Sequence, residues 1–191
     1  MKKSFIFLAD GFEEIEALAT VDILRRADIE VNTVTISPTL QVKGAHGVEV
    51  KADISISDVK CNENDILVLP GGMPGATNLA NCTQLSNMLV QHHNKKGTIA
   101  AICASPAVVL APLNILEGKE ATCYPGFEGA FTNCKKGYNP VVVDGNIITA
   151  NGPATAIPFA LTIVAKSLCE EKSREVAEGM LVYNPQQEYN F

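Results

Sequence analysis

A chain of 191 residues, of which 47% are hydrophobic and 19% charged, is long enough for one well-packed domain and short for two. Its formal net charge of −6 excludes a general nucleic-acid interface, although a local pocket could still take a small anion. No apolar stretch reaches the length of a membrane span or of a signal-peptide core, so we expect a cytoplasmic protein without a membrane partner.

Six cysteines are spread along the chain without a CxxC pair. In a reducing compartment this usage predicts no disulfide framework, and the wide spacing argues against structural zinc. We therefore expect no metal at these cysteines, and most of the thiols are expected to be buried or incidental. They are Cys61, Cys82, Cys103, Cys123, Cys134 and Cys169.

The start of the chain predicts a β-α-β unit. Residues 4–9 form an apolar run of strand length, and residues 29–36 alternate and are rich in β-branched side chains. This arrangement predicts a parallel pair with a right-handed crossover, and hence an α/β fold. In the helix between the strands, the residues expected to face inward are Ile15, Leu18, Ala19, Val21, Ile23 and Leu24, and those left for solvent are Glu13, Glu14, Arg25 and Arg26.

The middle of the chain predicts a hairpin, a buried strand and two helical segments. The hairpin has its turn at residues 44–47, between β-rich stretches. Residues 65–70 make a continuous apolar strand that ends in two glycines, and helical patterns follow at 75–79 and 84–94.

The apolar run 98–102 is the next buried strand, and it leads directly into Cys103 and a helix predicted over 107–113. A strand that turns straight into a helix leaves the residue at the turn beside the open N–H groups of that helix. A helix N-terminus favours the thiolate, which is the reactive form of cysteine. Pro106 suits the first turn, where its missing N–H costs nothing. Cys103 is therefore the first candidate for a nucleophile.

The last part of the chain predicts a second hairpin and two closing helices. With no repeat and no linker, residues 1–191 are expected to form one domain with a largely parallel sheet. The expected elements are a strand at 120–124, a loop or short helix at 125–136, hairpin strands at 141–143 and 147–150, helices at 156–168 and 172–181, and a polar tail at 183–191.

Three strand ends meet at the edge of a parallel sheet where ligands bind. The N–H groups of Gly72 and Ala104 could stabilise the negative oxygen formed when a thiolate attacks a carbonyl, although Gly71 and Gly72 also simply permit a tight turn. Glu16 lies on the inward side of its helix. A buried carboxyl beside the Cys103 thiolate would have a raised pKa and could donate or shuttle a proton.

Four segments carry a resemblance: GFEEIE at 11–16, LVLPGG at 67–72, AAICASP at 100–106 and NGPAT at 151–155. Together they resemble the DJ-1/ThiJ/PfpI family, and within it the DJ-1 and YajL branch, in the same order over roughly residues 3–182. The resemblance implies a flavodoxin-like three-layer α/β/α sandwich, usually homodimeric, with a reactive cysteine hydrogen-bonded to a protonated glutamate. Cys103 and Glu16 match that pair, and Gly72 and Ala104 match the backbone on the oxyanion side.

Departures from the family pattern argue against two classes of enzyme, peptidases and glutamine amidotransferases. Peptidase members carry a histidine directly after the cysteine, where this chain has Ala104, so a Cys-His peptidase is not expected. Tyr124 stands where DJ-1 has a histidine near the pocket, and His46 stands where it has an arginine lining an anion-binding spot, while Arg26 is retained. A glutamine amidotransferase needs a late histidine, but the last one here is His93.

Two functions remain. As an enzyme, Cys103 would attack an α-oxoaldehyde such as methylglyoxal, or an early adduct of one, and Glu16 would move a proton between carbons to give a hydroxy acid. This is the cofactor-free glyoxalase or deglycase chemistry attributed to the family. Alternatively, an exposed thiol of low pKa beside a protonated carboxyl would be oxidised to a sulfinate, as in a redox sensor or stress chaperone. The expected partners are a small carbonyl substrate and a second copy of the chain.

Overall fold

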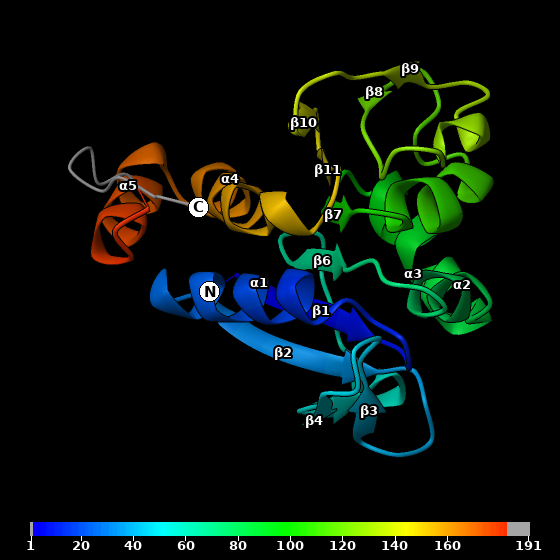
Figure 1. Ribbon diagram of the computed structural model, residues 1–191, viewed down its shortest axis with the longest axis horizontal. Helices are drawn as coiled ribbons and strands as arrows, with labels where there is room; N and C mark the ends of the chain where they lie inside the picture. The colour runs from blue at the N-terminus through cyan, green and yellow to red at the C-terminus, as the bar shows by residue number, and fades with distance from the viewer. Residues whose placement is uncertain (1, 183–191) are drawn as a thin grey trace.

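A seven-stranded sheet runs through the middle of the computed structural model, which describes residues 2–182 (Figure 1). In spatial order the strands are β10-β11-β7-β6-β1-β2-β5, and all neighbours are parallel except β10 and β11. The tail predicted at 183–191 lies outside the described residues. The strands are β1 (Lys3–Leu8), β2 (Glu30–Thr35), β5 (Ile54–Ser55), β6 (Ile66–Leu69), β7 (Thr98–Ile102), β10 (Val141–Asp144) and β11 (Ile147–Ala150).

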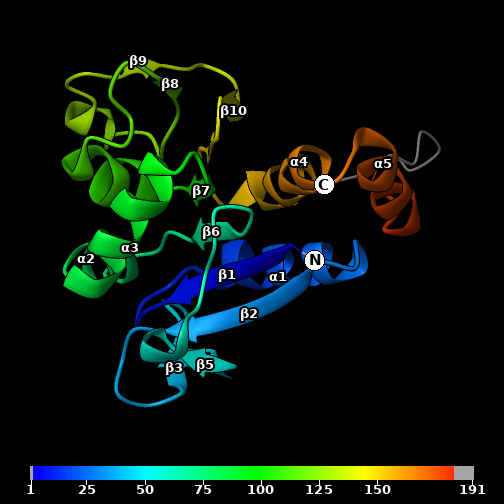
Figure 2. The same cartoon turned by 180° about the vertical axis from the view of Figure 1, so that it is seen from behind.

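Helices cover both faces of this sheet, so the molecule has three layers (Figures 1 and 2). The helices α1 (Glu14–Arg26), α4 (Ala156–Ser167) and α5 (Glu170–Gly179) lie on one side, and α2 (Gly75–Ala80) and α3 (Thr83–Asn94) lie on the other. None of the described helices is long and apolar enough to cross a membrane. The predicted flavodoxin-like α/β/α sandwich is confirmed.

Two buried apolar clusters fill the spaces between the layers. Along β1, Phe5 and Phe7 join the cluster beneath α2 and α3, whereas Ile6 and Leu8 join the cluster beneath α1 and α4. Successive side chains of a strand point to opposite faces, so a strand covered on both sides must be apolar at every position. This is why the central strands read as continuous apolar runs.

The register of the central strands determines where the loops after them meet. Leu69 of β6 pairs with Ala101 of β7, so Gly71 and Cys103 leave the sheet at the same level. β1 is the neighbour of β6 on its other side, and it too runs parallel. The carboxyl ends of all three strands therefore meet at one edge, as the sequence predicts.

Some local elements differ from the prediction. The helix expected at 107–113 is irregular, with a wide π turn over Pro106–Leu110 followed by a 3-10 turn over Ala111–Leu113. Pro112 has no N–H to donate and its ring crowds the preceding turn, so a regular helix cannot continue through it. The strand expected at 120–124 is reduced to β8 (Glu120–Ala121), which pairs with the unpredicted β9 (Lys135–Lys136).

Helix α1 follows its apolar pattern in its second half, where Val21, Ile23 and Leu24 are buried, but departs from that pattern in its first turns. Ile15 is 59% exposed and Leu18 is also exposed, although both are expected to face inward. Glu14, which is expected in solvent, is buried because the hairpin of β3 (Gln41–Lys43) and β4 (Glu49–Lys51) covers it. Helical spacing determines which residues share a face, but tertiary contacts decide which face is covered.

Candidate active site

Cys103 lies at the turn where β7 ends, and backbone hydrogen bonds hold it on both sides. Its φ angle of 65° is in the left-handed region, which a residue with a Cβ rarely adopts. The N–H of Cys103 donates to the carbonyl of Ala150 at 2.9 Å, and its own carbonyl accepts from the N–H of Tyr124 at 2.8 Å. The residue is only 8% exposed. The structure thus has a strained, nearly enclosed elbow at the predicted position.

The Glu16 carboxyl lies inside the protein beside the Cys103 thiol. Glu16 is 1% exposed, and its Oε2 accepts a hydrogen bond from the N–H of Gly71 at 2.7 Å. Its Oε1 is buried without a well-aligned partner, so the contact with the thiol is weaker than the bond from Gly71. Burial raises the pKa of Glu16 to about 7, against the lowering effect of these two hydrogen bonds. The carboxyl can therefore both accept and donate a proton near neutral pH.

The pKa of Cys103 is raised, although a position at a helix N-terminus is expected to lower it and favour the thiolate. Burial raises the pKa of Cys103 to about 12, and the negative charge of Glu16 acts in the same direction. Hydrogen bonds from the backbone N–H groups of Gly72 and Ala104 lower this pKa but do not outweigh burial. The resting site therefore favours the thiol, and any reaction of Cys103 as a thiolate would need a base that removes the proton.

A pocket of about 220 Å³ opens over the sulfur of Cys103. The N–H groups that bond the sulfur belong to Gly72 and Ala104, which are the predicted oxyanion donors. One wall is aromatic, because the rings of Tyr124 and Phe127 meet edge to face with their centroids 6.3 Å apart. The lining residues are Glu13, Gly72, Met73, Cys103, Ala104, Tyr124, Phe127 and Pro153.

The three residues that the resemblance puts near the pocket are placed differently from one another. Tyr124 lines the pocket. Arg26 does not reach it, because this residue ends α1 at the far end of the helix and its Nε donates to Asp22 at 2.7 Å. The His46 side chain is 70% exposed and lies outside the pocket wall, with Nδ1 3.7 Å from Glu13 Oε1.

Glu13 is a pocket residue that the sequence pattern misses. The interpretation of Glu13 as solvated is wrong, because its side chain is 13% exposed and lines the same pocket as Cys103. The neighbouring Glu14 contacts His46 Nδ1 at 2.8 Å, and this hydrogen bond raises the pKa of His46. Ligand atoms of Glu13, Glu14 and His46 lie within 4.8 Å of one another, a spacing that could hold a cation, but the Glu14–His46 pair already satisfies two of the three.

Gly71 has no room for a side chain between the thiol and the carboxyl. A Cβ added there would lie 2.6 Å from Cys103 Cβ and 2.9 Å from Glu16 Oε2. We expect Gly71→Ala to push the two groups apart and to lower kcat/KM by about tenfold or more, while overpacking costs about 1–3 kcal/mol of stability. Activity and the unfolding midpoint would be measured against Gly129→Ala, whose Cβ would meet nothing within 4 Å. Equal activity of the two variants would contradict the tight contact.

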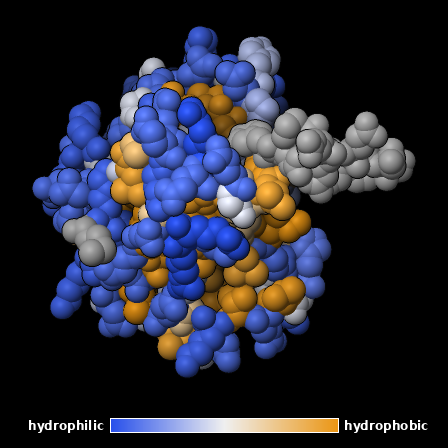
Figure 3. Space-filling view, turned by 90° about the vertical axis from the view of Figure 1, so that its left-hand side faces the viewer, coloured by the Kyte–Doolittle hydropathy of each residue, from blue (hydrophilic) through white to orange (hydrophobic). Residues whose placement is uncertain are grey.

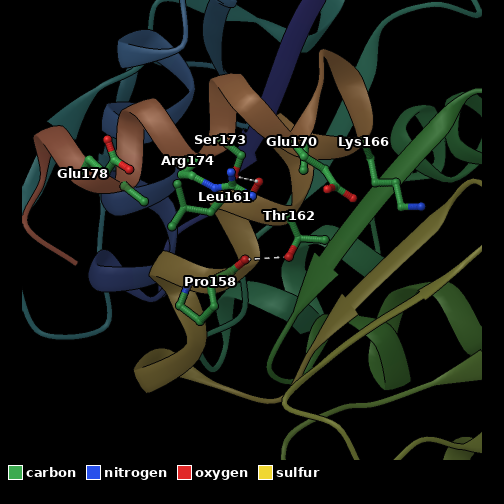
Figure 4. Close-up of a pocket in the computed structure, with 10 residues that line it drawn as sticks. Pro158, Leu161, Thr162, Lys166, Glu170, Ser173, Arg174 and Glu178 are labelled. Atoms are coloured by element: carbon green, nitrogen blue, oxygen red, sulfur yellow. Dashed lines mark hydrogen bonds between the residues drawn. The ribbon is translucent and has the colours of Figure 1, made fainter. Parts of the chain in front are cut away.

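A larger cavity of about 620 Å³ lies between α4 and α5, away from Cys103 (Figure 4). Its two hydroxyls are committed to backbone carbonyls: Ser173 donates to Leu161 at 2.8 Å and Thr162 donates to Pro158 at 2.7 Å. Figure 3 views the end of the molecule where α5 lies and shows apolar patches among hydrophilic side chains. The described lining of this cavity contains no cysteine, and its two hydroxyls are already hydrogen-bonded. The pocket at Cys103 is therefore the better candidate for an active site.

Known proteins are similar to this chain in sequence and in fold. A family model described as "DJ-1/PfpI family" matches residues 2–166. "Protein DJ-1 homolog B" of Arabidopsis thaliana is 39% identical over 92% of this chain, which spans only 40% of that relative's length. The Caenorhabditis elegans protein named "Glutathione-independent glyoxalase DJR-1.2" is 36% identical over 94% of this chain and 96% of its own. The structure titled "Toxoplasma gondii DJ-1, oxidized" aligns with a TM-score of 0.91 and 38% identity over 95% of this chain and 98% of that one.

Proposed function

Because the chain belongs to the DJ-1/PfpI family, we propose that it is a cofactor-free glyoxalase or deglycase that acts on α-oxoaldehydes such as methylglyoxal. The observation that carries this proposal is the buried Glu16 carboxyl, with a pKa of about 7, beside the Cys103 thiol. The relative named a glutathione-independent glyoxalase supports the same reaction class. Cys103 is proposed as the nucleophile and Glu16 as the group that moves protons.

The proposed reaction begins with proton transfer within the Cys103–Glu16 pair. Ionised Glu16 takes the thiol proton as the sulfur bonds to the aldehyde carbon, and it returns that proton to the new alkoxide oxygen. The product of this step is a hemithioacetal. The N–H groups of Gly72 and Ala104, which bond the sulfur at rest, are suited to stabilise the oxygen while it is negatively charged.

In the second stage, a proton moves between adjacent carbons. Glu16 removes the hydrogen of the former aldehyde carbon and delivers it to the neighbouring carbon. The hydroxyl proton on the first carbon passes to the oxygen of the neighbouring carbon, by way of an enediol, so that the hemithioacetal becomes a thioester of Cys103. Water then cleaves the thioester, releasing lactate and restoring the thiol. An early adduct of methylglyoxal with an amine or a thiol reaches the same hemithioacetal once the amine or thiol leaves.

The proposed function is tested by incubating the purified protein with methylglyoxal, without glutathione or metal, and measuring lactate. Lactate formation in proportion to protein concentration is expected. The absence of lactate above the rate without protein, across pH 6 to 9, would reject the glyoxalase reaction.

The alternative function, a redox sensor or stress chaperone, has less support. Selective oxidation by peroxide needs an accessible thiol of low pKa. Burial raises the pKa of the Cys103 thiol, so the low pKa assumed for this alternative is not met in the resting site. The enzymatic function is therefore preferred.

We also propose a homodimer formed through α1. Ile15 and Leu18 on α1, Val48 beside the hairpin turn and Ile157 at the start of α4 are large apolar residues exposed to solvent. They belong to neighbouring elements, because α1 packs along α4 and Glu14 binds the hairpin. An exposed apolar surface of this kind suits a second copy of the chain.

Replacing Ile15 with glutamate should therefore convert the dimer into a monomer, because the new charge would be buried at the interface without a partner. Sedimentation velocity measures the result. Tyr138→Glu is the control, since Tyr138 is a highly exposed aromatic residue on another part of the chain. A wild-type protein that sediments as a monomer at micromolar concentration would contradict the proposed dimer.

The cysteines support a reducing compartment. All six are free thiols, including the exposed Cys169. Free thiols persist where glutathione and thioredoxin keep them reduced, so the cytoplasm is the proposed location.

A further inference from the structure

The carboxylate of Glu13 lines the pocket without a hydrogen-bond partner of its own. Its side chain is 13% exposed, and among the described residues none donates a hydrogen bond to it. The backbone holds Glu13 in place, because its N–H donates to the carbonyl of Gly71 at 2.9 Å and its carbonyl accepts from the N–H of Ala17 at 3.1 Å. The backbone of Glu13 is therefore fixed beside the pocket that Cys103 also lines.

No positive charge in the pocket lining balances this carboxylate. The other described lining residues include no lysine, arginine or histidine. The nearby His46 lies 3.7 Å from Glu13 Oε1, but its Nδ1 is closer to Glu14, at 2.8 Å, and its side chain is 70% exposed. A molecule in the pocket thus meets the Glu13 carboxylate as well as the thiol, with no cation in the lining.

We propose that Glu13 determines specificity: the pocket accepts carbonyl compounds that are neutral or positively charged, and it rejects those that carry a carboxylate or phosphate next to the reacting carbon. This inference rests on the proposed function for the identity of the substrates, but not for the charge selection at Cys103. An ammonium, guanidinium, amide or hydroxyl group of a substrate would supply the donor that Glu13 lacks.

The size of the effect follows from the low solvent access of the site. Two like charges several ångströms apart in a partly buried pocket repel enough to change a rate by about tenfold or more. Removing the charge from Glu13 should relieve this repulsion for anions and weaken attraction for cations. The ratio of cation to anion reactivity should therefore fall by about tenfold or more in Glu13→Gln.

The first measurement uses thiol reagents and does not depend on any enzymatic activity. Two methanethiosulfonates of similar size, one ending in trimethylammonium and one in sulfonate, each form a disulfide with Cys103 and release methanesulfinate. The rate at which each reagent modifies Cys103 is measured by peptide mass spectrometry. It is divided by the rate of the same reagent with a small neutral thiol in solution, which corrects for the intrinsic reactivity of the reagent. The corrected rate ratio should favour the cationic reagent in the wild type and in Glu13→Asp, and should fall in Glu13→Gln.

A distant carboxylate provides the matched control. Glu175→Gln removes the same charge from the exposed surface of α5, which lies far from the hairpin of β3 and β4 (Figure 1). This variant should keep the wild-type ratio. If Glu13→Gln also keeps the wild-type ratio, or if Glu175→Gln lowers it equally, charge selection by Glu13 is rejected.

The second measurement compares kcat/KM for methylglyoxal, which is neutral, with kcat/KM for 2,3-dioxopropanoate, an α-oxoaldehyde that carries a carboxylate beside the dicarbonyl group. Each reaction is followed through its 2-hydroxy acid product. The preference for methylglyoxal should shrink by about tenfold in Glu13→Gln. If neither aldehyde reacts but the reagent ratio changes as expected, the proposed function fails while charge selection stands. If both aldehydes react and neither ratio responds to Glu13→Gln, the proposed function stands and charge selection by Glu13 is rejected.

Discussion

Replacing Cys103 with alanine should lower lactate formation from methylglyoxal by about a thousandfold or more. The sulfur makes the only covalent bond to substrate in the proposed reaction, and a methyl group has no electron pair to offer in its place. The loss of one buried sulfur atom should cost only about 1 kcal/mol of stability. Lactate should be measured over a range of substrate concentrations, because the loss is expected in kcat as well as in kcat/KM.

The matched control for this variant is Cys61→Ala. Cys61 is partly buried and precedes β6, so it lies toward the amino ends of the strands and away from the pocket. Its removal should leave lactate formation at the wild-type level. Turnover by Cys103→Ala equal to that of Cys61→Ala would show that the sulfur of Cys103 is not the nucleophile.

Replacing Glu16 with glutamine should lower kcat/KM for methylglyoxal by roughly 10²- to 10³-fold, because an amide cannot take the thiol proton or carry a proton between carbons. The wild-type kcat/KM should rise with pH through about 7, the pKa of Glu16, and the residual activity of the variant should lack this rise. Glutamine keeps an oxygen that can accept from the N–H of Gly71, so the loop should stay in place.

The double variant provides the control for this second prediction. If Cys103 and Glu16 act in one sequence of proton transfer and attack, combining Cys103→Ala with Glu16→Gln should lose little more activity than Cys103→Ala alone. Losses that multiply across the two sites would indicate that Glu16 acts independently of the thiol. A kcat/KM profile with the same rise near pH 7 in Glu16→Gln would assign that titration to another group.

The same carboxyl should also make folding stability depend on pH. Its pKa is about 7 in the folded protein against an ordinary value of 4.5, so the folded state favours the protonated form. This contribution is fully present below about pH 4.5, declines as the pH rises, and is lost once the pH has passed about 7. The shift corresponds to about 3 kcal/mol. Denaturant unfolding at pH 5 and pH 8 should show a smaller decrease for Glu16→Gln than for the wild type.

Local sequence patterns were sufficient to predict the central strands of the sheet and the position of the candidate nucleophile. The central strands are buried on both faces, so each appears as a continuous apolar run that is visible without neighbours. The sharp change at Cys103 from β-rich residues to small residues and Pro106 marks a turn into a helix. The carboxyl ends of parallel strands lie at one edge of the sheet. The sequence therefore predicts that Gly71, which follows β6, and Glu16, in the helix after β1, lie near this edge.

Local sequence patterns could not predict contacts between segments that are distant in the chain. The interpretation of Glu14 as solvated failed because the hairpin residue His46 lies 32 positions away, and helical spacing carries no information about what covers a helix. Ile15 and Leu18 have the correct spacing for a buried face, yet they are exposed, and the proposed dimer interface explains their apolar character.

The sequence by itself therefore determined the α/β class, the strand ends that meet at one edge and the identity of the candidate pair, Cys103 and Glu16. Only the tertiary structure decided the electrostatics of that pair. The N–H groups of Gly72 and Ala104 lower the pKa of Cys103, but burial raises it by more. The cost of desolvating a charge depends on all the residues that surround it, so the sequence alone does not show it. The same packing turns Glu13 into the pocket wall, where its charge acts on whatever approaches the thiol.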